Sequence, residues 1–328
     1  MCPAACARGA RSGEHASLCA RRFGTLRRFR GIRPLDCEGV VGSMTLQGVV
    51  AWAEAEENVR AAFLIGSRGE SDGQPDRLSD YDVLLFVRDR SRYESDERWL
   101  TAFGTILVKF HDGYEVLGSR VVTRLVQYRS GTRIDFSIHD VGLIERITQE
   151  ARLPDMLDAG SRVLVDKDDW ASRLPRATGE AYRGSLPTEA GYQAVVNEFW
   201  WEVIYVAKHL ARGELLPARY SQECVIRFQC LVPMLEWYAR AVHGAESRIG
   251  PHGRGLIREL EPAEVDRFNR TFLGSSIEEG WAGLFETTEY FRVTSTAVAE
   301  RLGFKVQDEL SNGVESLLRD MSVEGREP

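Results

Sequence analysis

The chain has 328 residues, of which 43% are hydrophobic and 28% charged, and its formal net charge is −7. This composition is typical of a globular protein of one or two domains and excludes disordered, collagen-like and disulfide-scaffold chains. The longest apolar runs, such as Val83 to Val87, fall far short of the roughly 18 to 20 residues of a membrane-spanning helix, so no membrane passage is predicted. The negative charge argues against nucleic acid as a partner and favours a cationic ligand.

The first 43 residues differ from the rest in composition. Their eight Arg and three acidic residues give a charge of +5, which leaves −12 for the remainder, and they hold four of the six cysteines. We interpret residues 1–43 as a non-native or disordered N-terminal extension, with Met44 as the functional start. An Arg-rich transit peptide and a zinc knuckle are the alternatives. The other two cysteines, Cys224 and Cys230, are predicted to be core residues of a protein in the reducing cytoplasm.

From Met44 to about residue 166 the pattern mixes helix and strand. An amphipathic segment at 46–58 is followed by turns rich in Gly and Asp that separate short β-rich runs. Strands are predicted at 61–65, 81–87, 105–109, 120–128, 132–138 and 162–165. The polar stretch 166–187 then looks like a linker.

Beyond the linker the pattern is helical. Thr188 is predicted to cap a helix that includes the periodic run Tyr192 to Ala211, with Gly191 close behind the cap. Further helices are predicted at about 219–243, 262–271, 276–302 and 306–321. We therefore expect a helical bundle in this half.

The chemistry is concentrated at residues 65–82. Gly66 follows a predicted strand, where it would let a phosphate approach the backbone, and Ser67 and free N–H groups could hold the phosphate oxygens. Asp80 and Asp82, two residues apart at the start of the next strand, project from one face. A divalent cation would relieve their repulsion, and hard oxygen ligands favour Mg²⁺. The alternative is one acid capping a turn and the other ending a strand in solvent.

A third acid, Asp135, lies in a predicted strand, with Arg133 and Ser137 on its face and apolar residues on the other. If this strand neighbours that of Asp82, Asp135 either ligates the metal or takes the proton from an attacking hydroxyl. The alternative is an exposed residue of an edge strand. His139 and Asp140 are predicted to be turn residues.

One face of the helix at 192–211 is aromatic and acidic. A cationic guanidinium- or amine-bearing sugar would be held by Glu198 and Glu202, with stacking on Trp201. The alternative is an exposed, salt-bridged face. The residues of this face are Glu198, Trp201, Glu202, Tyr205, Lys208 and His209. Lys208 either contacts a triphosphate or pairs with a neighbour such as Glu214.

These motifs together resemble a known family. Gly66-Ser67, Asp80-Tyr81-Asp82 and Asp135 resemble the nucleotidyltransferase superfamily that includes DNA polymerase beta, and the larger set resembles the streptomycin (aminoglycoside 6-) adenylyltransferases from about Met44 to Met321. The larger set is Gly66-Ser67-Arg68, Ser79 to Asp82, Gly131 to Asp135, Val163 to Asp168, Asn197 to Trp201 and Tyr205 to Lys208. Two departures bear on substrate fit: Phe228 stands where Pro is expected, and His209 where Gly commonly follows the Lys.

The resemblance implies an α+β fold: a polymerase-beta-like nucleotidyltransferase domain with a mixed sheet over 44–170, followed by an α-helical bundle over 187–322 that binds substrate. It implies Mg²⁺-dependent transfer of AMP from ATP to a hydroxyl of an aminoglycoside, with streptomycin the first candidate, and hence antibiotic resistance in the cytoplasm.

The resemblance also implies roles for individual residues. Asp80, Asp82 and Asp135 would be catalytic and hold the metal, with Asp135 the first candidate for general base and Glu198 the second. The nucleotide would be bound, between the two domains, by Gly66, Ser67, Arg68 and Lys208. The acceptor would be bound by Glu198, Trp201, Glu202 and Tyr205.

Two other functions stay open at this point. The chain could transfer a nucleotide to another small molecule, such as a lincosamide, or to a protein side chain. It could also be a non-enzymatic, antitoxin-like nucleotide-binding module, although such a module has no need of two metal-binding carboxylates.

Overall fold

The computed structural model describes residues 46–69, 75–180, 184–244 and 249–324. The expectations for residues 1–43 lie outside the described residues, and the domain limits 44–170 and 187–322 stay predictions.

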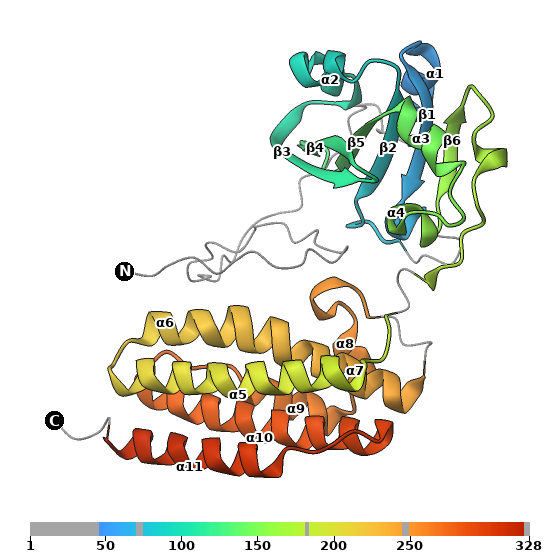
Figure 1. Ribbon diagram of the computed structural model, residues 1–328. Helices are drawn as coiled ribbons and strands as arrows, with labels where there is room; N and C mark the ends of the chain where they lie inside the picture. The colour runs from blue at the N-terminus through green and yellow to red at the C-terminus, as the bar shows by residue number, and fades with distance from the viewer. Residues whose placement is uncertain (1–45, 70–74, 181–183, 245–248, 325–328) are drawn as a thin grey trace. The chain divides into compact units, whose positions relative to one another are not determined.

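Six strands form one mixed sheet in the order β3-β4-β5-β2-β1-β6 (Figure 1). Strands β2 and β5 run parallel, whereas the other neighbouring strands pair antiparallel. Their bounds are β1 Val59–Ile65, β2 Tyr81–Val87, β3 Ile106–Val116, β4 Ser119–Tyr128, β5 Arg133–Asp140 and β6 Arg162–Asp166. Each predicted strand is present, although β3 runs well beyond 105–109, and the predicted α+β fold with a mixed sheet is confirmed.

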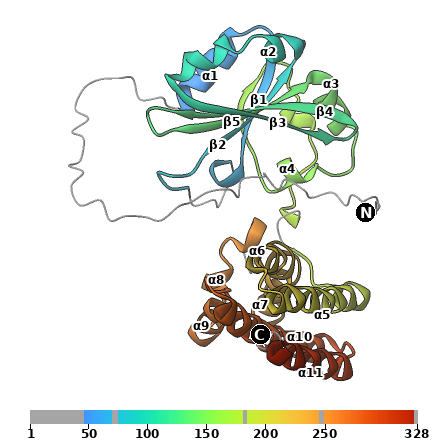
Figure 2. The same ribbon diagram turned by 90° about the vertical axis from the view of Figure 1, so that its left-hand side faces the viewer.

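Helices cover both faces of the sheet (Figure 2). Helix α1 (Leu46–Ala55) and the short α2 (Ser91–Ser95) contribute to the core on one face, and α3 (Val141–Ile147) and α4 (Asp155–Asp158) to the core on the other. Because alternate residues of a strand face opposite ways, β5 buries Ile134, Phe136 and Ile138 on the α1 face and turns Asp135 to the α3 face.

Two predictions for this half are wrong. His139 and Asp140 are the last residues of β5 rather than turn residues, because β5 continues to pair with β2 as far as Val87. The His139 ring is 1% exposed and stacks on Phe86, with 5.0 Å between ring centroids. The predicted linker also begins with packed structure, since Trp170 is buried in the core on the α3 face.

The second half is helical, and α5, α7, α10 and α11 pack alongside one another (Figure 2). The cap prediction is confirmed: the Thr188 hydroxyl accepts a hydrogen bond of 3.1 Å from the Gly191 N–H. None of the described helices is long and apolar enough to cross a membrane. The bounds are α5 Glu189–Ala211, α6 Leu215–Tyr220, α7 Val232–His243, α8 Leu256–Glu259, α9 Pro262–Arg270, α10 Ile277–Leu302 and α11 Asp308–Glu324.

Between α6 and α7 the chain is π-helical over Ser221–Leu231, where the sequence predicts a regular helix. Arg227, 2% exposed, lies in this stretch, where its guanidinium donates to the Glu223 carboxylate and to two oxygens of Thr271. This buried network ties the stretch to the end of α9. The prediction for Cys230 is confirmed by its burial, but Cys224 is exposed and is not a core residue.

Burial lowers the pKa of His139 from 6.5 to about 3, so the folded protein excludes a proton that the unfolded chain accepts below pH 6.5. We therefore expect the free energy of unfolding to fall by about 1.4 kcal/mol per pH unit through this residue as the pH drops below 6.5. His139→Phe, which keeps an aromatic ring against Phe86, should remove this contribution to the pH dependence of the unfolding free energy. Urea unfolding of both proteins at about pH 7 and about pH 5 measures it. An identical pH dependence in the two proteins would contradict the assignment.

Candidate active site

The two strand acids are brought together by the only parallel pairing among the described strands. In the register of β2 and β5, Asp82 pairs with Asp135, and both side chains therefore lie on one face of the sheet. Asp80 lies immediately before β2, two residues from Asp82. The structure thus gathers all three predicted acids at one end of two central strands.

Burial and like charge act on this cluster. Burial, followed by the charges of Asp135 and Asp80, raises the pKa of Asp82 to about 6. Burial also raises the pKa of Asp80, while the Arg133 charge opposes the rise. The site therefore holds carboxylates whose negative charge is incompletely compensated, which favours a cation.

Gly66 lies against Asp82. It follows β1 in a left-handed conformation, with φ of +66°, and opens the 3₁₀ turn Gly66–Arg68. A Cβ at this position would lie 2.6 Å from Asp82 Oδ2, so no other residue fits without displacing that carboxylate. The glycine leaves backbone open beside the acid, which is what a phosphate between the two requires.

Ser67 and Arg68, the next two residues, differ in the hydrogen bonds that their side chains form. The half-buried Ser67 forms no hydrogen bond to any residue that the structure describes, so its hydroxyl is available to a ligand. Arg68 is already engaged: its guanidinium donates to the carbonyls of Asp76 and Ser79 and lies 4.2 Å from the centroid of the Tyr81 ring. Arg68 thus holds the turn that leads into Asp80.

Arg133 pairs with the acids. Its Nε and Nη2 donate to the two carboxylate oxygens of Asp135 at 2.8 and 2.7 Å, and its Nε is 3.5 Å from Asp80 Oδ2. The sequence places Arg133 on the face of Asp135 by strand alternation, but no sequence pattern shows this ion pair.

The donor chemistry of the cluster suits a hard divalent cation, because three carboxylates meet on one face and burial disfavours the charge of Asp80 and Asp82. Among the described residues, no three His, Cys, Asp or Glu side chains are already arranged to hold a metal ion. The set fits Mg²⁺ in ligand type but not in its present arrangement, in which Arg133 engages both oxygens of Asp135.

Helix α5 carries the predicted acidic and aromatic face. Trp201 is 74% exposed and Tyr205 49% exposed, while Phe199, Val203 and Leu210 are buried on the opposite side. Burial raises the pKa of Glu202, and the charge on Glu198 one turn away raises it further. This face has the composition that a cationic ligand needs.

The end of that face differs from the prediction. His209 is buried, and its Nδ1 lies 2.6 Å from Glu214 Oε2, so Glu214 pairs with His209 rather than with Lys208. Lys208 stays exposed. Phe228, the other departure from the family pattern, is 47% exposed in the π-helical stretch.

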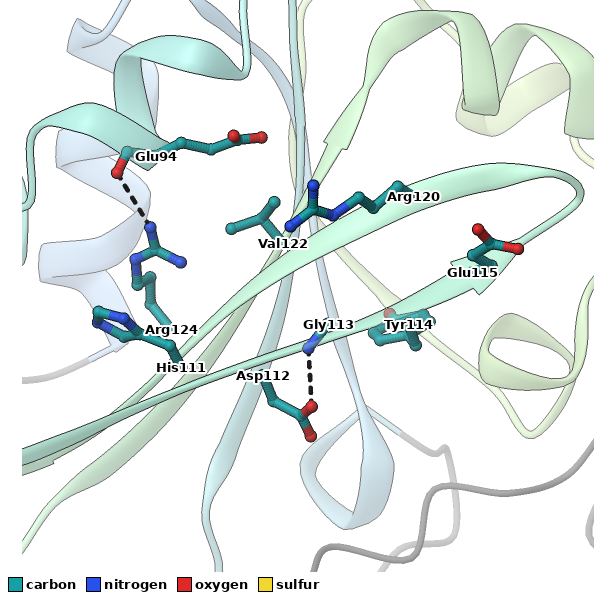
Figure 3. Close-up of a pocket in the computed structure, with 9 residues that line it drawn as sticks. All are labelled: Glu94, His111, Asp112, Gly113, Tyr114, Glu115, Arg120, Val122 and Arg124. Carbon is teal, nitrogen blue, oxygen red and sulfur yellow. Dashed lines mark hydrogen bonds between the residues drawn. The ribbon is translucent and has the colours of Figure 1, made fainter. Parts of the chain in front are cut away.

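A groove of about 610 Å³ lies beside the β3–β4 hairpin (Figure 3). Its Val122 pairs with Ile138 and its Arg124 with Phe136, so both lie on the α1 face, opposite Asp135. Figure 3 shows His111 and Arg124 on one side of the hairpin and Asp112 on the other. The α1 side of the groove is therefore not part of the candidate active site, although Tyr114, which also lines the groove, lies on the face of Asp135.

With this geometry in place, the comparison with known proteins decides the family. A sequence model described as streptomycin adenylyltransferase matches residues 43–321. The chain belongs to the streptomycin adenylyltransferase family. Its members are nucleotidyltransferases, so the predicted enzyme class and the nucleotidyltransferase fold are confirmed, and the non-enzymatic alternative is not supported.

Three relatives that match the chain are named aminoglycoside 6-adenylyltransferase. That of Bacillus subtilis (strain 168) is 26% identical over 257 residues, which are 77% of this chain and 88% of the relative. That of Campylobacter jejuni is 25% identical over 261 residues, 78% of this chain and 88% of the relative. A crystal structure of an aminoglycoside 6-adenyltransferase from Bacillus subtilis aligns with 86% of this chain and 99% of its own, at 22% identity and a TM-score of 0.42.

The structure adds two partly buried ionisable residues, Tyr114 and Glu236, that the sequence alone does not predict. Tyr114 comes from β3; burial raises its pKa, a hydrogen bond with Ser137 opposes the rise, and the Asp82 charge adds to it. Glu236, in α7, has its pKa raised by burial against the opposing charge of Arg240. Neither stands in a recognisable motif, since each depends on neighbours distant in sequence.

The contact between Gly66 and Asp82 predicts a large effect of Gly66→Ala. Gly118, with φ of +70° and no atom within 4 Å of its would-be Cβ, is the matched control. We expect Gly118→Ala to cost about 1 kcal/mol of unfolding free energy through backbone strain alone. Gly66→Ala should cost at least about 1 kcal/mol more, because the methyl group displaces a carboxylate. Urea unfolding measures both, and equal losses would show that the contact with Asp82 is unimportant.

Proposed function

We propose that this enzyme transfers AMP from ATP to a hydroxyl of an aminoglycoside in an Mg²⁺-dependent reaction, with streptomycin the first candidate. The observation that carries the proposal is the pairing of Asp82 with Asp135 beside a glycine that leaves the backbone open to a phosphate.

The nucleotide is assigned to the β1 end of the cluster. Gly66 and the Ser67 hydroxyl bind the phosphate oxygens, and Arg68 acts on them indirectly by fixing the turn before Asp80. Mg²⁺, held by Asp80, Asp82 and Asp135, would neutralise phosphate charge and orient the α-phosphorus. Lys208 is a further candidate for phosphate binding.

The attacking hydroxyl has to lose its proton as its oxygen bonds to the α-phosphorus and pyrophosphate leaves. Asp135 is our candidate for the general base, because it is a carboxylate on the face of Asp82 and the oxygen that does not hold the metal could accept the proton. Glu198 is the second candidate. The chain's part in the reaction is chiefly to position the groups and compensate their charge.

The acceptor is assigned to α5. Burial, and then repulsion by Glu198, raises the pKa of Glu202, and a guanidinium or ammonium group there would compensate the charge of both acids. The exposed Trp201 and Tyr205 offer ring faces to the same cation or to the sugar. Such a reaction in the cytoplasm would inactivate the antibiotic and confer resistance. A different aminoglycoside is the principal alternative acceptor.

The reaction is tested by pyrophosphate release from ATP and Mg²⁺ with and without streptomycin. We expect release that depends on streptomycin and falls at least about 100-fold in Asp82→Asn, because metal charge stabilisation is worth several kcal/mol. Asp112→Asn, on the exposed edge strand, is the matched control and should keep its rate. Failure to release pyrophosphate with streptomycin and with every other aminoglycoside would overturn the proposed acceptor class.

The acceptor face is tested separately by Glu202→Gln. Loss of this charge should raise the KM for the aminoglycoside by about 10-fold and leave the KM for ATP unchanged, because a charge-assisted hydrogen bond contributes about 1.5 to 3 kcal/mol. Glu300→Gln, an exposed acid in α10, controls for net charge. Equal aminoglycoside KM values in the two variants would exclude Glu202 from the binding site.

A further inference from the structure

The guanidinium of Arg133 lies where the acid cluster needs a cation. It engages both oxygens of Asp135, at 2.7 and 2.8 Å, and its Nε also lies 3.5 Å from Asp80 Oδ2. A bidentate pair of this kind is among the strongest that a carboxylate forms. Arg133 thus links two of the three acids assigned to the metal.

The exposures of the two partners differ. The Asp135 side chain is 16% exposed, whereas that of Arg133 is 41% exposed. Asp135 is fixed by its strand and its neighbours, while the long Arg133 side chain has room to move away through solvent. The pair can therefore open without any change in the backbone.

Electrostatics sets the two cations against each other. A divalent ion coordinated by Asp135 would lie within a few ångströms of the guanidinium that donates to the same carboxylate. Two cations this close repel, and each weakens the attraction of the carboxylate for the other.

We propose that Arg133 is an internal counter-ion that stabilises Asp80 and Asp135 before the metal binds and gives up its pairing with Asp135 when the metal binds. This rests on the proposed function, which supplies the metal. Arg133 is thus a positioning residue. It stabilises the folded arrangement of the acids, and it lowers their affinity for the metal when no nucleotide is bound.

The test measures metal binding by the full chain without nucleotide or acceptor. This measurement does not depend on catalytic activity. Mn²⁺ is the probe, titrated into metal-stripped protein and followed by electron paramagnetic resonance of the free ion. Arg133→Gln should bind Mn²⁺ about tenfold more tightly than the unchanged protein, because a positive charge near the ion has been removed. Arg129→Gln removes the same charge from an exposed turn nearby and should bind as the unchanged protein does.

Thermal unfolding supplies the second readout. In EDTA, Arg133→Gln should unfold at a lower temperature than the unchanged protein. Saturating Mn²⁺ should raise the unfolding temperature of the variant by more than it raises that of the unchanged protein. Arg133→Lys, which keeps the charge but cannot pair through two nitrogens, should lie between the two in both measurements. It also keeps the test valid if Arg133→Gln does not fold.

The outcomes separate this inference from the proposed function. Unchanged or weaker Mn²⁺ binding in both Arg133 variants, with normal binding by the unchanged protein, overturns the counter-ion role alone. Binding that survives Asp82→Asn in every background shows that Mn²⁺ is held elsewhere, which overturns the metal site and this inference with it.

Discussion

The site depends on the parallel register of β2 and β5. It sets Asp82 opposite Asp135, and a slip of one residue would turn Asp135 into the apolar core on the α1 face, where Ile134 and Phe136 now lie. The antiparallel pairing of β1 with β2 adds the next component, because Ile65 pairs with Asp82 and so places the following Gly66 beside that carboxylate. The large apolar side chains on both faces of the sheet hold this register.

Both halves of the chain contain acids whose charge is costly to keep. In the sheet, burial and neighbouring acids raise the pKa of Asp82. On α5, burial and Glu198 raise that of Glu202. Such arrangements weaken a fold unless a cation compensates them. In the sheet Arg133 supplies part of that compensation, and the remainder is what makes the cluster suited to a metal ion.

Rigid elements surround these acids. Arg68 fixes the turn before Asp80 through two backbone carbonyls, and Phe86 of β2 stacks on His139 of β5. In the helical half, Phe199 of α5 stacks on Phe291 of α10 at 3.6 Å between centroids. The reacting and binding side chains are therefore carried by well-packed elements. A ligand can shift individual side chains there, but not a whole strand or helix.

The sequence by itself determined the elements and the motifs, because both are local. Alternation predicts the β2 and β5 faces, and the Thr188 cap is encoded within four residues. Gly66-Ser67 with three acids indicates the superfamily, and the larger set of motifs indicates the family. The tertiary structure decided what depends on residues distant in sequence. It paired Arg133 with Asp135, directed Arg68 to the turn carbonyls, buried His139, exposed Cys224 and made 221–231 π-helical around Arg227. Each of these outcomes depends on which strands and helices become neighbours, and local pattern carries no information about that because contact energies act between surfaces brought together only by folding.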